Sequence, residues 1–140
     1  MAREIFVDTS GFYALVVRRD DQHAAAKKIL DQARRRRKAF VTTDYVLDET
    51  ITLLAARGLA HLVEPFLQST LESRACLVEW MHPERFTEAR RMLGKHLDQG
   101  WSFTDCVSFV VMKQRGLREA LTKDKHFGEA GFSALLRGAR

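Results

Sequence analysis

The chain of 140 residues is 46% hydrophobic and 29% charged, and it carries a formal net charge of +5. That length supports a hydrophobic core without stapling by disulfides or metals, so we expect one domain over residues 1–140. The excess of basic residues favours a polyanionic partner such as nucleic acid.

The cysteines and the N-terminal segment indicate the cellular compartment of the protein. Cys76 and Cys106 both lie in apolar surroundings, which predicts small buried hydrophobic side chains in a reducing compartment, not a disulfide or a cysteine metal site. The chain reaches the acids Glu4 and Asp8 too early for a signal peptide, and no apolar run approaches the length of a membrane span. We therefore expect a cytoplasmic protein with no membrane segment.

Short apolar runs alternate with helical patterns along the chain. The runs typical of strands are residues 4–7, 39–42, 76–80 and 120–122. The helical patterns are residues 22–35, 44–57, 60–73, 82–97 and 103–115, and a turn with a short strand or helix follows residue 124. Asp20 or Asp21 is expected to cap the first helix, Gly58 to stop the second, and Pro65 to kink or restart the third. This alternation predicts an α/β fold, a three-layer α/β/α sandwich around a mostly parallel sheet.

One acid stands at the entrance of an apolar segment, in "WSFTDCVSF". Ser102 followed three residues later by Asp105 fits a capped helix start, and a first-turn acid suits the positive end of the helix dipole. The segment behind it is apolar enough to be buried nearly all round, where charge is expensive. Capping alone is one explanation for Asp105, and a bound cation is the other.

A dense basic run, residues 34–38, closes the first helical pattern. Cations suit the C-terminal end of a helix and stay solvated there, which is one explanation. Contact with the phosphates of a nucleic acid is the other.

Four acids are candidates for one site. In open parallel sheets, ligands bind outside the carboxyl ends of the strands. Asp8 directly follows the first strand, Asp124 lies near the end of the fourth, and Asp105 heads the helix between the third and fourth strands. Glu49 lies at the edge of the apolar stripe of its helix, which favours it over Asp48 as the inward acid.

Several carboxylates held together repel one another unless they share a cation. Oxygen ligands with no histidine or cysteine partner suit a hard divalent ion, Mg²⁺ or Mn²⁺. The five histidines are scattered without a zinc-like spacing. His126, which follows Asp124, is a candidate for a place near the site, and a surface or loop-packing role is the favoured alternative. Such sites serve phosphoryl chemistry, in which metal-activated water attacks a phosphodiester.

Other enzyme classes lack their motifs. A haloacid-dehalogenase-type phosphatase needs a second Asp where "FVDTSG" has Ser10. The chain contains neither a Walker-type loop nor a dinucleotide-binding glycine motif, and no nucleophile elbow points to a serine triad.

Four segments together carry a resemblance to a known family: "IFVDTSGFYAL", "LDETITLL", "SFTDCVSFVVM" and "ALTKDKHF". In this order they resemble a PIN domain, most closely the small PIN ribonucleases of VapC-type toxin–antitoxin pairs. The resemblance covers essentially the whole chain. It implies a Mg²⁺- or Mn²⁺-dependent endoribonuclease that leaves a 5′-phosphate and a 3′-hydroxyl, a homodimer, and a small antitoxin protein as partner.

The same resemblance implies roles for particular residues. Asp8 and Asp105 match direct metal ligands, Asp124 a ligand acting through water, and Glu49 a residue that orients a ligand or water. Lys123 departs from the family pattern, in which an apolar residue often precedes the last acid.

Two hydroxyl residues, Thr9 and Thr104, flank the acids. Their hydroxyls are candidates for binding a ligating water or the scissile phosphate, and capping is an alternative for Thr104. Two alternatives to a toxin also stay open: a non-catalytic RNA- or protein-binding PIN module, and a housekeeping RNA-processing nuclease. The RNA that is cut is not specified by these motifs.

Overall fold

The computed structural model describes residues 4–138, which contain a five-stranded, all-parallel sheet. The strands are β1 (Glu4–Val7), β2 (Ala39–Thr43), β3 (Cys76–Glu79), β4 (Glu119–Leu121) and β5 (Ser133–Ala134). Their order across the sheet is β3-β2-β1-β4-β5, and every neighbouring pair is parallel.

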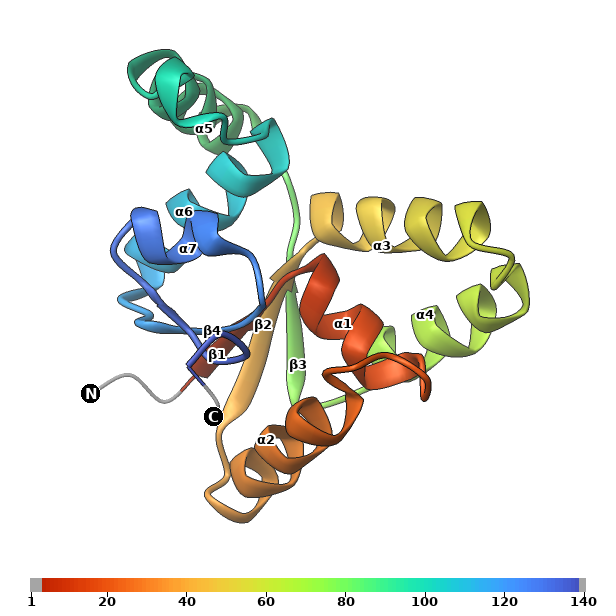
Figure 1. Ribbon diagram of the computed structural model, residues 1–140. Coiled ribbons are helices and arrows are strands. Elements are labelled where there is room, and N and C mark those ends of the chain that lie inside the picture. Colours follow the sequence, from red (N-terminus) through yellow and green to blue (C-terminus); the bar gives the residue numbers. More distant parts are fainter. Residues whose placement is uncertain (1–3, 139–140) are drawn as a thin grey trace.

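Seven α-helices connect or follow the strands: α1 (Thr9–Val16), α2 (His23–Arg35), α3 (Asp44–Ala56), α4 (Val63–Leu71), α5 (Pro83–Lys95), α6 (Phe103–Arg115) and α7 (Lys125–Glu129). Two short 3₁₀ turns are η1 (Ala60–Leu62) and η2 (Leu97–Gln99). Helices α1 to α4 lie on one side of the sheet and α5 to α7 on the other (Figure 1). This arrangement confirms the expected α/β/α sandwich, with a sheet that is parallel throughout in the described residues.

The core forms where both faces of the sheet are covered. β1 is buried from Ile5 to Val7, as expected for a parallel strand with helices on both sides. On the α6 side, residues 106–112 are all buried, so α6 is enclosed nearly all round as its apolar sequence predicts. Phe109 at its centre packs edge-on against Phe127 of α7, with ring centroids 4.9 Å apart.

Several expected boundaries agree with the structure and several do not. α6 begins and ends where predicted, and the segment around Pro65 restarts as expected, with η1 followed by α4. β4 begins one residue before the expected 120–122, and β3 ends one residue earlier than expected, at Glu79. Neither Asp20 nor Asp21 caps α2: the N-cap is Gln22, whose backbone N–H donates to Asp20 in the preceding turn.

One helix, α1, was not predicted. Its sequence, TSGFYALV, contains a glycine and β-branched residues, which weaken the helical signal. Its first turn is stabilised by Asp8, whose side chain accepts a hydrogen bond from the backbone N–H of Gly11. α1 therefore starts directly at the carboxyl end of β1.

The strand order places a switch point beside β1. The chain moves from β1 to β2 on one side, and β4 later pairs with β1 on the other side. Outside the carboxyl ends of such strands lies the position where α/β folds bind ligands. Within residues 4–138, no helix is both long and apolar enough to cross a membrane.

Candidate active site

Three of the four predicted acids lie at a helix start or in a first turn near the carboxyl edge of the sheet, and Glu49 lies in a second turn. Asp8 follows β1 as the N-cap of α1, and Asp124 follows β4 as the N-cap of α7. Asp105 is in the first turn of α6, and Glu49 is in the second turn of α3. Local capping therefore fixes three of these carboxylates at positive helix ends.

Asp8 is the most buried of the four acids, with 7% of its surface exposed. Its Oδ1 accepts hydrogen bonds from the Gly11 N–H (3.0 Å) and the Ser10 hydroxyl (2.9 Å), and its Oδ2 accepts one from the Thr122 hydroxyl (2.8 Å). Burial raises the pKa of Asp8 to about 7, although these hydrogen bonds oppose the rise; the charge of Asp124 adds to it. A cation beside Asp8 would restore its charged form at neutral pH.

Thr122 links Asp8 to Asp124. Its hydroxyl donates to Asp8 and accepts the backbone N–H of Asp124 at 2.9 Å. Ser10 lies on the same network, because its hydroxyl accepts the Lys123 N–H at 3.0 Å and is 3.2 Å from the Thr122 hydroxyl. The acid pattern did not predict Ser10 or Thr122; each is a hydroxyl residue two positions from an acid, and that spacing is the signal that points to them.

Asp105 helps to cap α6, in whose first turn it lies, and also belongs to the cluster of acids. The Ser102 hydroxyl accepts the Asp105 N–H (3.0 Å), and Asp105 Oδ2 accepts the Ser102 N–H (3.1 Å), which completes the predicted capping box. Burial raises the pKa of Asp105; the Ser102 N–H opposes the rise, the charge of Asp124 adds to it, and His126 opposes it. Capping does not remove Asp105 from the cluster of acids.

Of the two positions that the sequence left open for His126, the structure shows the one beside the acids. Its Nδ1 lies 3.1 Å from Asp105 Oδ2 and 3.4 Å from Asp124 Oδ1. One ligand atom from each of Asp105, Asp124 and His126 lies within 4.8 Å of the others. The cause is local: α7 starts directly after Asp124, so its first turn brings His126 back over the carboxylate that caps it.

Glu49 reaches the cluster through α1. The Thr9 hydroxyl donates a hydrogen bond to Glu49 Oε1 at 2.6 Å, and the Thr50 hydroxyl lies 3.4 Å from that of Thr9. Glu49 itself is exposed, as is Asp48, but it is Glu49 that contacts the residue next to Asp8.

Thr104 is half-buried in the first turn of α6. Ser102, not Thr104, caps this helix, and the Thr104 hydroxyl makes no hydrogen bond with the described residues. It therefore remains a candidate for contact with a water or a phosphate.

The donor set fits a hard divalent cation. Asp8 Oδ2 accepts one hydrogen bond and keeps a lone pair, while Asp105 Oδ1 and Asp124 Oδ2 accept none from the described residues. Carboxylate oxygens are the ligands that Mg²⁺ and Mn²⁺ prefer. Asp105 and Asp124, together with His126, form the group of possible ligands in the described part of the chain.

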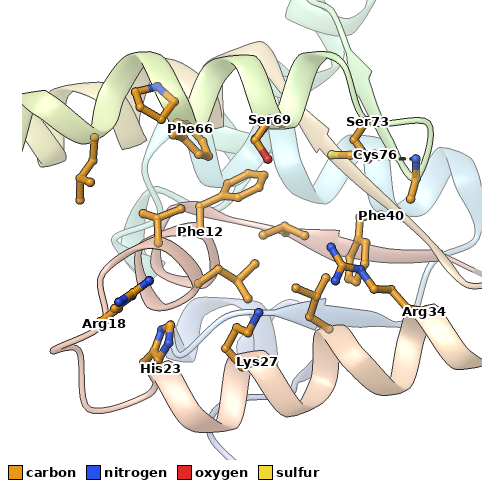
Figure 2. A pocket seen from close by; sticks show the side chains of 18 residues that line it. Phe12, Arg18, His23, Lys27, Arg34, Phe40, Phe66, Ser69, Ser73 and Cys76 are labelled. Atoms are coloured by element: carbon orange, nitrogen blue, oxygen red, sulfur yellow. Dashed lines mark hydrogen bonds between the residues drawn. The ribbon is translucent and has the colours of Figure 1, made fainter.

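A separate cavity, here called the groove, lies between α1, α2 and α4 (Figure 2). It has a volume of about 540 Å³, and none of the four acids lines it. Phe12, Phe40 and Phe66 form part of its apolar lining, and the rings of Phe12 and Phe66 are 5.0 Å apart. Lys27 and Arg34 project into it from α2. This groove is distinct from the acid cluster.

The basic run at residues 34–38 lies where α2 ends and β2 begins. Because the strands are parallel, this is the opposite edge of the sheet from the acids. Lys38 is ion-paired with Glu119 at 3.2 Å. The position argues against contact between this run and a phosphate bound at the acid cluster, and Arg34 instead lines the groove.

Comparison with known proteins identifies similar chains. The family model described as PIN domain matches residues 5–133. Two Mycobacterium tuberculosis proteins, from strains CDC 1551 / Oshkosh and ATCC 25618 / H37Rv, are named 23S rRNA-specific endonuclease VapC20. Each is 33% identical over 128 residues, which cover 91% of this chain and 95% of the relative. The crystal structure of M. tuberculosis VapC20, titled a Sarcin-Ricin loop cleaving toxin, matches with a TM-score of 0.82 and 32% identity over 91% of this chain and 95% of that one.

Proposed function

Because the chain belongs to the PIN-domain family of nucleases, we propose that its acid cluster is the active site of a metal-dependent endoribonuclease that hydrolyses RNA phosphodiester bonds. The observation that carries the proposal is the network from Asp8 through Thr122 to Asp124, with Asp105 beside it. This network brings together, at the carboxyl edge of the sheet, acids that are up to 116 positions apart in the sequence. Asp8 is buried there, and its hydrogen-bond partners include no cationic side chain. A non-catalytic RNA-binding module would gain nothing from carboxylates that repel its ligand.

Each of the four acids has a proposed role in binding the ion or orienting the attacking water. We assign Asp8 and Asp105 as direct ligands of the ion and Asp124 as a ligand through water, the roles that the resemblance to PIN domains implies. Glu49, held by Thr9 at the exposed side of the cluster, would orient a water for attack on the phosphate. When bound, Mg²⁺ or Mn²⁺ would lower the pKa of a water molecule and provide a positive charge beside the scissile phosphate.

The proposed substrate is a structured loop of 23S ribosomal RNA, as named for the mycobacterial relatives. Cationic side chains stand beside the cluster: Lys123 and Lys125 flank Asp124, and both are exposed. The guanidinium of Arg137 donates to the Lys123 carbonyl at 3.1 Å, which keeps a third cation next to them. These cations would bind the phosphates on either side of the bond that is cut. With such a substrate, the proposed location of the protein is the cytoplasm.

A small antitoxin protein is the proposed partner, and the groove between α1, α2 and α4 supports it. The groove combines an apolar floor with the cations Arg18, Lys27 and Arg34. An amphipathic segment with an acidic face complements both features. Binding there would leave the acid cluster accessible, so inhibition would need a second segment of the partner that reaches the acids.

A homodimer is the proposed assembly. β3 is an edge strand, and Leu77 on it is 46% exposed. Trp80, just beyond β3, is 59% exposed, and Phe86 on α5 is 46% exposed. Exposed aromatic side chains beside an open strand edge favour association with a second copy. Sedimentation equilibrium of the wild type beside Trp80→Ser tests this: a dimer that the substitution converts to monomer is expected, and a monomeric wild type refutes it.

The nuclease proposal is tested by incubating purified protein with total structured RNA and with an oligonucleotide of the 23S rRNA loop. Reactions contain Mg²⁺, Mn²⁺ or EDTA. Cleavage with metal and none with EDTA is the expected result, and mapping of the ends should give a 5′-phosphate and a 3′-hydroxyl. RNA that stays intact while binding to the protein would favour the non-catalytic module instead. Growth arrest on expression in bacteria would separate a toxin from a housekeeping nuclease.

A further inference from the structure

The imidazole of His126 faces the acid cluster with one atom. Its Nδ1 is 3.1 Å from Asp105 Oδ2 and 3.4 Å from Asp124 Oδ1. The side chain is 22% exposed, so the ring is largely enclosed between the first turns of α6 and α7. The nitrogen is thus directed at two carboxylates and not at solvent.

A hydrogen bond does not account for this position fully. Nδ1 carries either one proton or one lone pair, so it can donate to one of the two oxygens only. Each oxygen is already oriented by a backbone N–H: Asp105 Oδ2 by that of Ser102 at 3.1 Å, and Asp124 Oδ1 by that of His126 at 2.9 Å. Neither carboxylate needs the ring to fix its direction.

A shared cation uses all three groups at once. An ion between them would take the Nδ1 lone pair and a carboxylate oxygen of Asp105 directly and would hold Asp124 through a water, and one ligand atom from each of the three residues lies within 4.8 Å of the others. Imidazole nitrogen is a softer ligand than carboxylate oxygen, and first-row transition ions accept it more readily than Mg²⁺ does. Mg²⁺ also dehydrates reluctantly and is satisfied by one or two carboxylates and water.

We propose that His126 is a nitrogen ligand of the divalent cation in the acid cluster, and that it makes the site bind Mn²⁺ in preference to Mg²⁺. The inference rests on the proposed metal-dependent nuclease and names a residue that an all-carboxylate site leaves out. It assigns His126 to metal selectivity, and it leaves phosphodiester cleavage to the acids.

The test compares wild type, His126→Asn and a control, His61→Asn, whose side chain is exposed on η1, away from the acids. Titration calorimetry gives the Mn²⁺ and Mg²⁺ dissociation constants of each. In His126→Asn the preference for Mn²⁺ over Mg²⁺ should fall by at least about tenfold, mainly through weaker Mn²⁺ binding. His61→Asn should keep the wild-type preference.

Pulsed electron paramagnetic resonance of the Mn²⁺-loaded protein reads the ligand directly. Wild type and His61→Asn should show the hyperfine coupling of a coordinated imidazole nitrogen, and His126→Asn should not. The wild-type spectrum decides the matter even if the His126 variant folds poorly. A wild type without nitrogen coupling, or equal weakening of Mn²⁺ and Mg²⁺ binding in His126→Asn, overturns the proposal.

RNA cleavage by the same preparations keeps the two proposals apart. A wild type that cuts RNA with metal but lacks nitrogen coupling refutes the role of His126 and leaves the nuclease standing. A wild type that shows nitrogen coupling but cuts no RNA refutes the nuclease and leaves the metal ligand in place.

Discussion

Ser102 and Asp105 exchange hydrogen bonds at the start of α6, and the same Asp105 carboxylate lies beside Asp124 and His126. One side chain therefore caps a buried helix and belongs to the acid cluster. Oδ2 accepts the Ser102 N–H and also lies against His126, while Oδ1 accepts no hydrogen bond from the described residues and stays available to an ion. Substitutions can separate the two functions.

Asp105→Asn should reduce the rate of RNA cleavage by at least about 100-fold, while the domain stays folded. The amide oxygen can still accept the Ser102 N–H, but the lost charge removes a metal ligand, and the ion contributes several kcal/mol to the transition state. The matched control is Ser102→Ala, which should lower the free energy of unfolding by about 1 kcal/mol and leave cleavage nearly unchanged. Cleavage assays and thermal unfolding of the two variants measure both effects. An Asp105→Asn protein that cuts RNA at the wild-type rate would leave Asp105 as a helix cap only.

The buried Asp8 carboxyl should make the metal-free protein less stable as pH rises. Its pKa is about 7 in the folded protein and 3.8 as the ordinary value, so between these values the native state holds a proton that the unfolded state has lost. The stabilising contribution is complete below about pH 4 and is lost as pH rises toward 7; it amounts to about 4 kcal/mol. In Asp8→Asn this part of the pH dependence should vanish.

Urea unfolding in EDTA between pH 5 and 8 measures this difference as the gap between the wild-type and Asp8→Asn curves. Mg²⁺ or Mn²⁺ should stabilise the wild type most above pH 7, because the ion binds the charged carboxylate, and it should stabilise Asp8→Asn much less. Parallel curves for the two proteins would mean that Asp8 ionises as an ordinary surface acid.

The Thr9 hydroxyl should matter to catalysis through Glu49. Thr9→Val keeps the shape of the side chain but removes the 2.6 Å hydrogen bond to Glu49 Oε1, so the carboxylate loses its fixed position. Cleavage should fall by about tenfold, the size of effect seen when residues that orient a metal site are lost. Thr9→Ser retains the hydroxyl and should cut RNA at close to the wild-type rate. If both variants cleave alike, Glu49 does not act through Thr9.

The sequence alone predicts elements whose signals are local. The bounds of α6 follow from the capping box at Ser102 and from Gly116, which ends the helix with φ of 67°. Asp8, Asp105 and Asp124 were identified because each lies at or near a strand end or at a helix start, and Glu49 because it lies at the edge of the apolar stripe of its helix. Capping residues are visible in a short stretch of sequence, and here they coincide with the candidate ligands.

What escaped prediction depends on contacts between distant parts of the chain. His126 meets Asp105 across 21 positions, and Thr122 meets Asp8 across 114. No local pattern states that these pairs are in contact. α1 was missed for a related reason: the glycine that weakens its helical signal is required by the neighbouring strand end.

Gly11 is that residue, and it fixes how closely α1 approaches β4. A Cβ atom at position 11 would lie 2.0 Å from the Leu121 carbonyl oxygen and 3.1 Å from a methyl group of Val7. The obstructing atom is backbone and cannot rotate away, so α1 or β4 must move. The next residue after Leu121 is Thr122, which holds Asp8 and Asp124 together.

Gly11→Ala should therefore destabilise the protein by about 3 kcal/mol or more and reduce cleavage even where the variant is folded. The matched control is Gly94→Ala, because a Cβ in α5 at Gly94 meets no atom within 4 Å. Alanine favours a helix over glycine, so this change should be neutral or stabilise the protein by up to about 1 kcal/mol, with cleavage unchanged. Urea unfolding and RNA cleavage of both variants at a temperature below either transition measure the contrast. A Gly11→Ala protein with wild-type stability would show that the approach of α1 to β4 can relax without disturbing the acids.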